Sequence, residues 1–163
     1  MLFRSADGPS SLLFSRQAVP FVSRSAVQIE LISRGAYVVR DAAQARAVLI
    51  ATGSELGLAL AARERLLASG IEVRIVSMPS TTVFDRQGTA YRASVLPEGL
   101  PRIAVEAGVT DFWWKYRVDA VVGIDRFGES APAGALNTLF GFTADNVADT
   151  VREVLRQRSA ARR

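Results

Sequence analysis

The 163-residue sequence contains neither histidine nor cysteine. Without histidine the chain lacks the commonest general base and the commonest metal ligand, which excludes a Ser-His-Asp triad and a histidine-ligated zinc site. Without cysteine it has no disulfide framework and no thiolate chemistry, a composition that suits a reducing compartment. We therefore expect a cytoplasmic protein with no histidine- or thiolate-based catalytic site and no histidine-ligated metal site.

Long apolar runs are missing as well, because the longest uninterrupted ones have only the length of a β-strand. A membrane-spanning helix needs about 20 predominantly apolar residues. A membrane is therefore not expected as a partner.

Basic charge comes almost entirely from arginine, which accounts for all but one of the 20 basic residues, and the net charge is +4. Several arginines gather near the end of the chain, where such a run can attract phosphates or nucleic acid. No aromatic residues alternate with them, and no nucleic-acid-binding motif lies nearby. We interpret 158–163 as a solvated basic tail and do not expect nucleic acid as a partner.

Apolar residues predict a strand–helix–strand unit in the first half of the chain. The continuous run at 47–51 is typical of a strand buried on both faces, and 71–77 forms a second strand that ends before Pro79. Between them, Ser54 is placed to cap a helix that runs to about Ser69 and ends before Gly70. Such a unit predicts a right-handed crossover and parallel pairing of the two strands.

The rest of the chain continues the alternation of strands and helices. Further strands are expected at 12–15, 37–39, 102–105 and 120–123, and further helices at 132–140 and after Thr143, which can cap the last one. Residues 18–35 contain a proline, several serines and a glycine, and are interpreted as a linker or irregular excursion. We predict a single α/β domain, a three-layer α/β/α sandwich with a mostly parallel sheet.

Two glycine-bearing segments resemble chemical motifs. The turn at 51–57 leads into a helix N-terminus that can cradle a phosphate, but it has neither the G-x-G-x-x-G spacing nor a P-loop lysine. We interpret it as a tight turn with Ser54 as N-cap. The segment 128–132 suggests a nucleophile elbow, yet its second glycine is missing and no histidine can activate Ser130. Glu129 and Ser130 are expected to organise the turn before the helix that starts near Pro132.

The most aromatic stretch, 112–116, contains Lys115 and follows two carboxylates, Glu106 and Asp111. Three interpretations stay open: rings packed on the sheet, a protein contact surface, and a ligand platform on which Glu106 and Asp111 carry out acid–base chemistry.

Nine short segments in fixed order resemble the C-terminal end of transketolase. They are Gly-Pro to Ser-Arg-Gln at 8–17, then 34–37, 51–55, 76–80, 84–85, 91–97, 106–108, 127–132 and 141–143. The similarity is greater than to deoxyxylulose-phosphate synthase or the pyruvate dehydrogenase β chain, which share the domain fold. It implies that 1–35 is a remnant of the pyrimidine-binding domain and a linker, and that 36–157 is a transketolase C-terminal-like domain.

The resemblance also implies a function and one site residue. Transketolases use thiamine diphosphate and Mg²⁺ to transfer a two-carbon ketol unit between sugar phosphates of the pentose phosphate pathway. In that family the arginine of the Ser-Arg-Gln triplet contacts the substrate phosphate. Arg16 occupies the matching position and is the expected ligand of a sugar phosphate, because a guanidinium binds phosphate through two parallel hydrogen bonds.

Several family features have no counterpart here. Ala18-Val19 replace the usual Asn-Leu, and 116–123 is shorter than usual. The thiamine-activating glutamate, the Gly-Asp-Gly motif and the substrate-binding histidines are missing, so we expect the chain alone to bind no cofactor and to be inactive.

Three hypotheses follow from these gaps. The chain is the C-terminal section of a split transketolase whose partner chain carries the thiamine-diphosphate-binding domains, a non-catalytic binding or regulatory module, or a truncated remnant. Away from those domains, the chain should expose unmatched apolar surface, and residues 1 to about 35 should be poorly ordered or make aberrant contacts.

Overall fold

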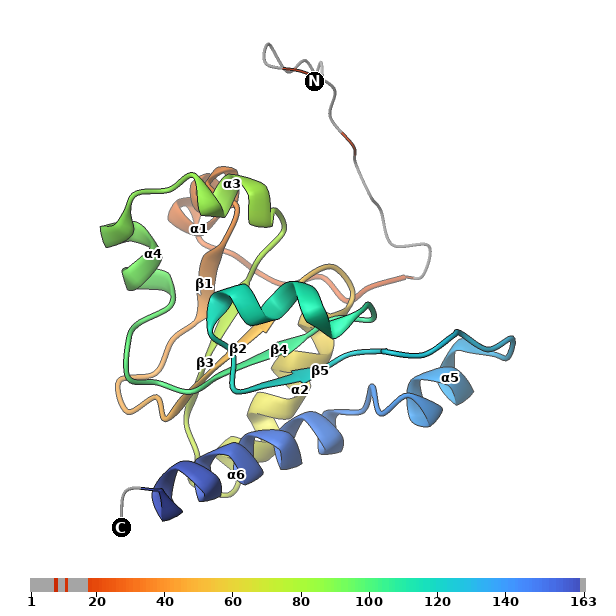
Figure 1. Cartoon of the computed structure of the whole chain (residues 1–163). Helices are drawn as coiled ribbons and strands as arrows, with labels where there is room; N and C mark the ends of the chain where they lie inside the picture. The colour runs from red at the N-terminus through yellow and green to blue at the C-terminus, as the bar shows by residue number, and fades with distance from the viewer. Residues whose placement is uncertain (1–7, 9–10, 12–17, 162–163) are drawn as a thin grey trace.

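The computed structural model describes residues 8, 11 and 18–161, which form a mixed five-stranded sheet covered by helices (Figure 1). The strands are β1 (Tyr37–Arg40), β2 (Ala47–Ala51), β3 (Val73–Ser77), β4 (Arg102–Val105) and β5 (Ala120–Val122). Their order in the sheet is β1-β3-β2-β4-β5. Only β1 pairs antiparallel, with β3, while β2, β3, β4 and β5 pair in parallel. The mostly parallel sheet is therefore confirmed.

Helices pack on both faces of this sheet. The longer ones, α2 (Glu55–Leu67) and α6 (Ala144–Ala160), cover one face. The other face is covered by α3 (Thr81–Asp85), α4 (Thr89–Val95) and the 3₁₀ helix η2 (Thr110–Tyr116). Two short helices, α1 (Ala26–Leu31) and η1 (Ile32–Arg34), precede β1, and α5 (Ala133–Leu139) lies on a projection that follows β5 (Figure 1). The three-layer α/β/α sandwich is confirmed.

Alternation along the strands divides the hydrophobic core into two parts. Leu49, Ile75 and Ile103 point to the layer of α2 and α6, whereas Val48 and Ile50 point to the layer of α3, α4 and η2. Every residue of β2 is fully buried, as expected for a strand covered on both faces. Each large side chain buried in this way contributes roughly 1.5–3 kcal/mol.

The crossover helix α2 has the predicted apolar periodicity, but it lacks the predicted side-chain cap from Ser54. Leu56, Ala59, Ala62 and Leu66 are its buried face. The side chain of Ser54 does not cap the helix; its hydroxyl donates to the carboxylate of Glu55 instead, at 2.8 Å. The helix keeps its place because burial against the sheet contributes more than one cap.

The final helix begins as predicted and ends later. The hydroxyl of Thr143 accepts a hydrogen bond from the backbone N–H of Asn146 at 3.2 Å, so Thr143 is the N-cap. Because α6 continues to Ala160, Arg158 lies in the helix rather than in a tail. It forms an ion pair of 2.8 Å with Asp119.

Residues 26–34 are helical, although no regular structure was expected in 18–35. Ser25 and Gln28 form a capping box at the start of α1. The Gln28 amide also donates to the carbonyls of Val38 and Val39, at 2.9 and 3.0 Å, and thereby ties α1 to β1. The strand expected at 12–15 lies outside the described residues. Within the described part of the chain, no helix has the length and hydropathy to cross a membrane.

Candidate functional site

The structure places the sequence-predicted site residues in different parts of the molecule. Arg16 lies outside the described residues. In the turn before α2, the backbone N–H of Glu55 donates to the carbonyl of Thr52 at 3.1 Å, and that of Gly57 to Ser54 at 3.3 Å. These donors are used within the turn, which agrees with a structural role rather than phosphate binding.

The segment 128–132 lies on the projection before α5. Glu129 forms an ion pair with Arg126 and so helps to organise this turn, as expected. Pro132 occupies the N-cap position of α5 without a side-chain hydrogen bond. No side-chain hydrogen bond from Ser130 to another described residue is present, so the expected part of Ser130 in the turn is not found.

The aromatic stretch lies in η2, and packing on the sheet holds for two of its four rings. Trp113 is buried, and its indole N–H donates to the carboxylate of Glu106 at 2.7 Å. Tyr116 is buried as well, whereas Phe112 and Trp114 are 45% and 49% exposed. Two rings therefore pack on the sheet and two face outward. The carboxylate of Glu106 accepts this hydrogen bond from Trp113 and is therefore not the free acid–base group that the ligand-platform interpretation required.

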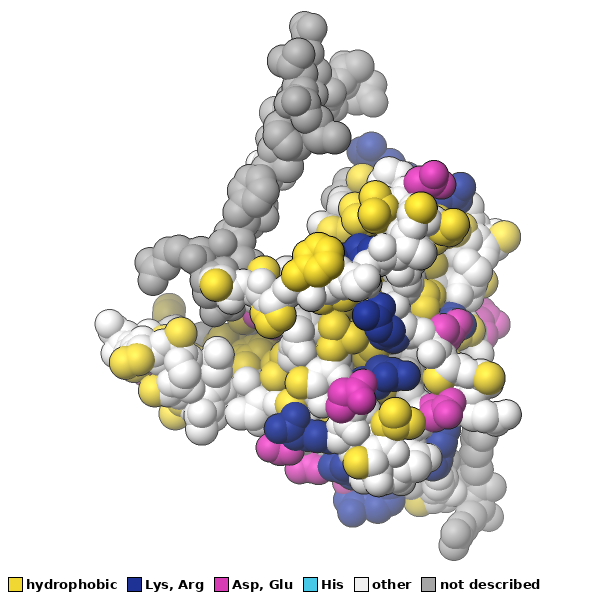
Figure 2. All heavy atoms as spheres, turned by 180° about the vertical axis from the view of Figure 1, so that it is seen from behind, with side chains coloured by type: hydrophobic (Ala, Val, Ile, Leu, Met, Phe, Trp, Pro, Cys, Tyr) yellow, Lys and Arg dark blue, Asp and Glu magenta, His cyan; other side chains and the backbone are white. Residues whose placement is uncertain are grey.

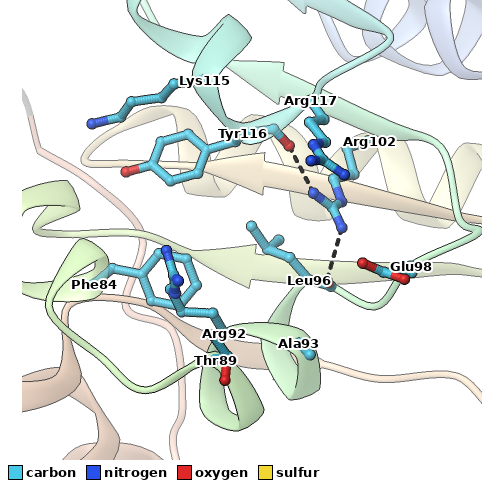
Figure 3. A pocket seen from close by; sticks show the side chains of 10 residues that line it. All are labelled: Phe84, Thr89, Arg92, Ala93, Leu96, Glu98, Arg102, Lys115, Tyr116 and Arg117. Atoms are coloured by element: carbon cyan, nitrogen blue, oxygen red, sulfur yellow. Dashed lines mark hydrogen bonds between the residues drawn. The ribbon is translucent and has the colours of Figure 1, made fainter.

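A pocket of about 500 Å³ opens between α4, the segment 96–102 and the end of η2 (Figure 3). Four cationic side chains line it, together with one carboxylate, that of Glu98. The cations are Arg92, Arg102, Lys115 and Arg117. The rings of Phe84 and Tyr116 form part of its wall, with their centroids 6.2 Å apart. The pocket is thus both basic and partly apolar.

Arg102 holds the floor of this pocket in place. Its Nη1 donates to the carbonyl of Tyr116 at 2.7 Å, and its Nη2 donates to the carbonyl of Leu96 at 2.8 Å (Figure 3). The same Nη2 also donates to the carbonyl of Pro97 at 3.2 Å. Burial lowers the pKa of Arg102, and the positive charge of Arg117 lowers it further. The guanidinium nevertheless stays charged, because arginine does not deprotonate in proteins.

Asp85 connects α3 to two residues of η2 that line the pocket, Lys115 and Tyr116. Its carboxylate accepts from Lys115 Nζ and from the Tyr116 hydroxyl, both at 2.8 Å. Burial alone would raise the pKa of Asp85, but these hydrogen bonds and the charge of Lys115 outweigh burial and hold the pKa below its ordinary value of 3.8. Burial and the hydrogen bond to Asp85 raise the pKa of the Tyr116 hydroxyl.

Asp85 predicts a loss of stability in acid. Because its pKa is lower in the folded chain than in the unfolded one, the carboxylate stabilises the fold above the unfolded pKa, and this contribution is lost as the pH falls through the folded pKa. Asp85→Asn should lower the free energy of unfolding at pH 7 by about 0.5–1 kcal/mol, since such half-exposed pairs contribute little. Urea unfolding should show this difference shrinking as the pH falls below the ordinary value of 3.8 and through the lowered pKa of the folded chain. If Asp85→Asn lowered the free energy of unfolding equally at pH 7 and in acid, the role of Asp85 would be contradicted.

A metal site does not emerge from the described residues. Across 18–161, with residues 8 and 11, no three His, Cys, Asp or Glu side chains stand together in a way that could hold an ion. Mg²⁺ prefers carboxylate and phosphate oxygens. The residues present therefore do not fit the metal of a thiamine-diphosphate enzyme, and we derive no reaction step through the cofactor.

Residues 35–143 match the sequence model of the family described as the transketolase-like C-terminal domain. The chain belongs to this family. It is 52% identical to transketolase 1 of Vibrio cholerae over 153 residues, which cover 91% of this chain and 23% of that protein. A transketolase variant from Pichia stipitis superposes with a TM-score of 0.83 at 36% identity, over 89% of this chain and 21% of that one. The resemblance inferred from the nine segments is confirmed.

A further solved relative is a "split gene transketolase, inactive beta4 tetramer". It superposes with a TM-score of 0.63 at 26% identity, and the match covers 86% of this chain and 48% of that one. By contrast, the chain spans less than a quarter of the length of the curated transketolases it matches.

The basic pocket of this transketolase C-terminal domain was not found from the sequence. Its cations come from α4, from the start of β4 and from the end of η2, which are separated along the chain. No motif spacing connects them. The one feature of the sequence that could have pointed to the pocket was Lys115 in the aromatic stretch, because Lys115 lines the pocket.

Proposed function

We propose that this chain is the C-terminal section of a transketolase. Together with upstream domains, it takes part in transferring a two-carbon ketol unit between sugar phosphates of the pentose phosphate pathway, in the cytoplasm. The observation that carries the proposal is 52% identity to transketolase 1 of V. cholerae over nearly the whole described chain. Thiamine diphosphate and Mg²⁺ belong to the upstream domains in this proposal.

The chain by itself is proposed to be inactive. It has no histidine, and its described residues offer no carboxylate cluster for a metal ion. It corresponds to 23% of the length of the V. cholerae enzyme. The solved split-gene relative supports the proposal, since that tetramer of one chain type is called inactive. A partner chain is the proposed source of these domains, in line with the name of the split-gene relative.

Exposed apolar side chains support docking on those domains. The projection that carries α5, at the right of Figure 1 and the left of Figure 2, has hydrophobic side chains on its surface. Phe127 is 96% exposed, and none of the residues of α5 is buried. A helix of this length is marginal in water without tertiary contacts. Neighbouring domains that cover the projection would supply those contacts.

Arg16 is the proposed ligand of the substrate phosphate. The support is the Ser-Arg-Gln triplet at 15–17, which matches the family segment in residue type and in order relative to the other segments. A non-catalytic anion-binding module is the second candidate function, and the observation that favours it is the basic pocket.

A chimera tests the first proposal. In it, this chain replaces the corresponding 153-residue section of V. cholerae transketolase 1. With ribose 5-phosphate, xylulose 5-phosphate, thiamine diphosphate and Mg²⁺, the chimera should keep kcat within about tenfold of the parent, which is about 1.4 kcal/mol of barrier. The isolated chain and the parent without the section should show no activity.

The controls separate folding from function. Size-exclusion chromatography and circular dichroism should show that the chimera assembles like the parent. A folded, cofactor-loaded chimera without activity would contradict the proposal and favour a binding module or a remnant. Activity of the isolated chain would contradict the proposed need for upstream domains.

A further inference from the structure

The basic pocket carries more positive charge than its own carboxylates balance. Among the four lining cations, Lys115 forms an ion pair with Asp85. Within the described residues, no carboxylate lies within ion-pair distance of Arg92, Arg102 or Arg117. Glu98 is the one acidic side chain in the lining. Counting three unpaired arginines against Glu98 leaves a charge of about +2 facing the pocket.

The arginines are held in this arrangement by the fold. Three hydrogen bonds to carbonyls fix the guanidinium of Arg102. Arg117 follows η2 in the left-handed region, with φ 53°, and its N–H donates to the carbonyl of Trp114 at 2.9 Å. This backbone turns the side chain of Arg117 back beside Arg102 (Figure 3). Two adjacent guanidiniums repel each other, and an anion between them removes that repulsion.

Aromatic and aliphatic groups form the opposite part of the lining. Phe84 is fully buried, the ring of Tyr116 packs against it at a tilt of 44°, and Leu96 is a third apolar residue in the lining (Figure 3). Arg92, from α4, lines the same pocket as Phe84 (Figure 3). A volume of about 500 Å³ is in the range of pockets that take small organic molecules. A bare inorganic ion would leave the apolar part of the lining unused.

We propose that this pocket binds a small organic phosphate monoester. Its phosphate lies between Arg102, Arg117 and Arg92, and its organic body packs on Tyr116 and Leu96. A monoester fits the charge, since it carries between −1.5 and −2 at neutral pH. A guanidinium that is free among the described residues, such as that of Arg92 or Arg117, forms two parallel hydrogen bonds to phosphate oxygens. Arg102, whose Nη1 and Nη2 already donate to carbonyls, contributes mainly its charge. Binding here does not depend on the proposed catalytic function.

Titration of the isolated chain with phenyl phosphate at low ionic strength tests the proposal. Binding is measured by calorimetry and by NMR of the arginine side chains. We expect Kd near or below about 1 mM, which is modest for a ligand of this size. Inorganic phosphate and benzoate should each bind at least about tenfold more weakly, because one lacks the apolar body and the other the second charge.

Variants of both signs connect the binding to this pocket. Arg92→Gln and Arg117→Gln should each weaken phenyl phosphate binding about tenfold. Glu98→Gln should tighten it severalfold, because it removes the opposing charge. Arg86→Gln, at an exposed arginine of α3's C-terminal end, is the matched control and should leave Kd unchanged. Arg102 is left intact because its hydrogen bonds hold the segment 96–97.

Four results would overturn the proposal. The first is the absence of saturable binding below about 10 mM, and the second is an equal Kd for phenyl phosphate and inorganic phosphate. The third is an equal effect of Arg117→Gln and Arg86→Gln on the Kd. The fourth is that Arg16→Ala abolishes binding while Arg117→Gln leaves it unchanged. Each variant is accepted only if its melting temperature matches that of the parent chain. Because the assay reads binding to the isolated chain, its outcome is independent of whether the chimera is active.

Discussion

Arg16→Ala in the chimera is expected to lower kcat/KM for xylulose 5-phosphate about a hundredfold, while kcat/KM for a non-phosphorylated ketose donor changes less than about twofold. The reason is the loss of two charge-assisted hydrogen bonds to the phosphate, each worth about 1.5 kcal/mol or more. Together they amount to about 3 kcal/mol, and 1.4 kcal/mol is tenfold. Steady-state kinetics with both donors measures the two effects.

Two further variants show whether Arg16 acts through the paired N–H donors of its guanidinium or through its charge alone. Arg16→Lys keeps the charge without the planar pair of donors and should recover only part of the loss. Arg86→Ala, at an exposed arginine, should leave both donors unaffected. Equal losses for the phosphorylated and the non-phosphorylated donor would show that Arg16 has a structural role, and would remove it from the substrate site.

The sheet was predictable because its strands are short apolar runs that the fold buries on both faces. Residues 47–51 and 102–105 read as strands, and both are strands with fully or largely buried residues. Thr143 was predictable as a cap because its pattern is local: hydroxyl and accepted N–H lie three residues apart. Signals of this kind need no knowledge of what lies elsewhere in the chain.

The short helices were missed because tertiary contacts maintain them. The Gln28 amide ties α1 to carbonyls of β1, ten and eleven residues away. In α3, only five residues long, Phe84 is the buried one. Segments of one or two turns give too few apolar positions to show a helical period, and their intrinsic stability is low. The end of α6 was misplaced for a related reason, since Arg158 bonds to Asp119 across the fold.

The candidate site was less predictable than the fold. Nothing local marks Arg117 as a left-handed residue that brings its side chain beside Arg102, because the conformation depends on how η2 ends above the sheet. Arg16 was identified only through family resemblance, since an isolated arginine is usually a solvated surface residue. Charge in a pocket is a property of chain segments that meet in space, and single-sequence patterns do not contain it.

Gly35→Ala is expected to destabilise the domain by about 4 kcal/mol. Gly35 has φ +85°, which costs a residue with a Cβ atom about 1–2 kcal/mol. In addition, the new Cβ would overlap the Ser80 carbonyl oxygen and the Phe84 backbone nitrogen, which belong to the first turn of α3. Overpacking against backbone typically adds about 1–3 kcal/mol. The melting temperature should fall by about 10 °C for a domain of this size.

Gly99→Ala is the matched control, because Gly99 has φ +86° and no heavy atom within 4 Å of the added Cβ. It carries the backbone strain without the overlap and should cost only about 1–2 kcal/mol in urea unfolding. The difference between the two variants isolates the contact between Gly35 and α3, whose backbone bond from Ser80 N–H to the Gly35 carbonyl is 3.0 Å long. α3 carries Phe84 into the wall of the basic pocket, and its Asp85 holds the lining residues Lys115 and Tyr116. Gly35→Ala should therefore also weaken phenyl phosphate binding, whereas Gly99→Ala should not. Equal stabilities for the two variants would show that α3 moves away from Gly35 at no cost.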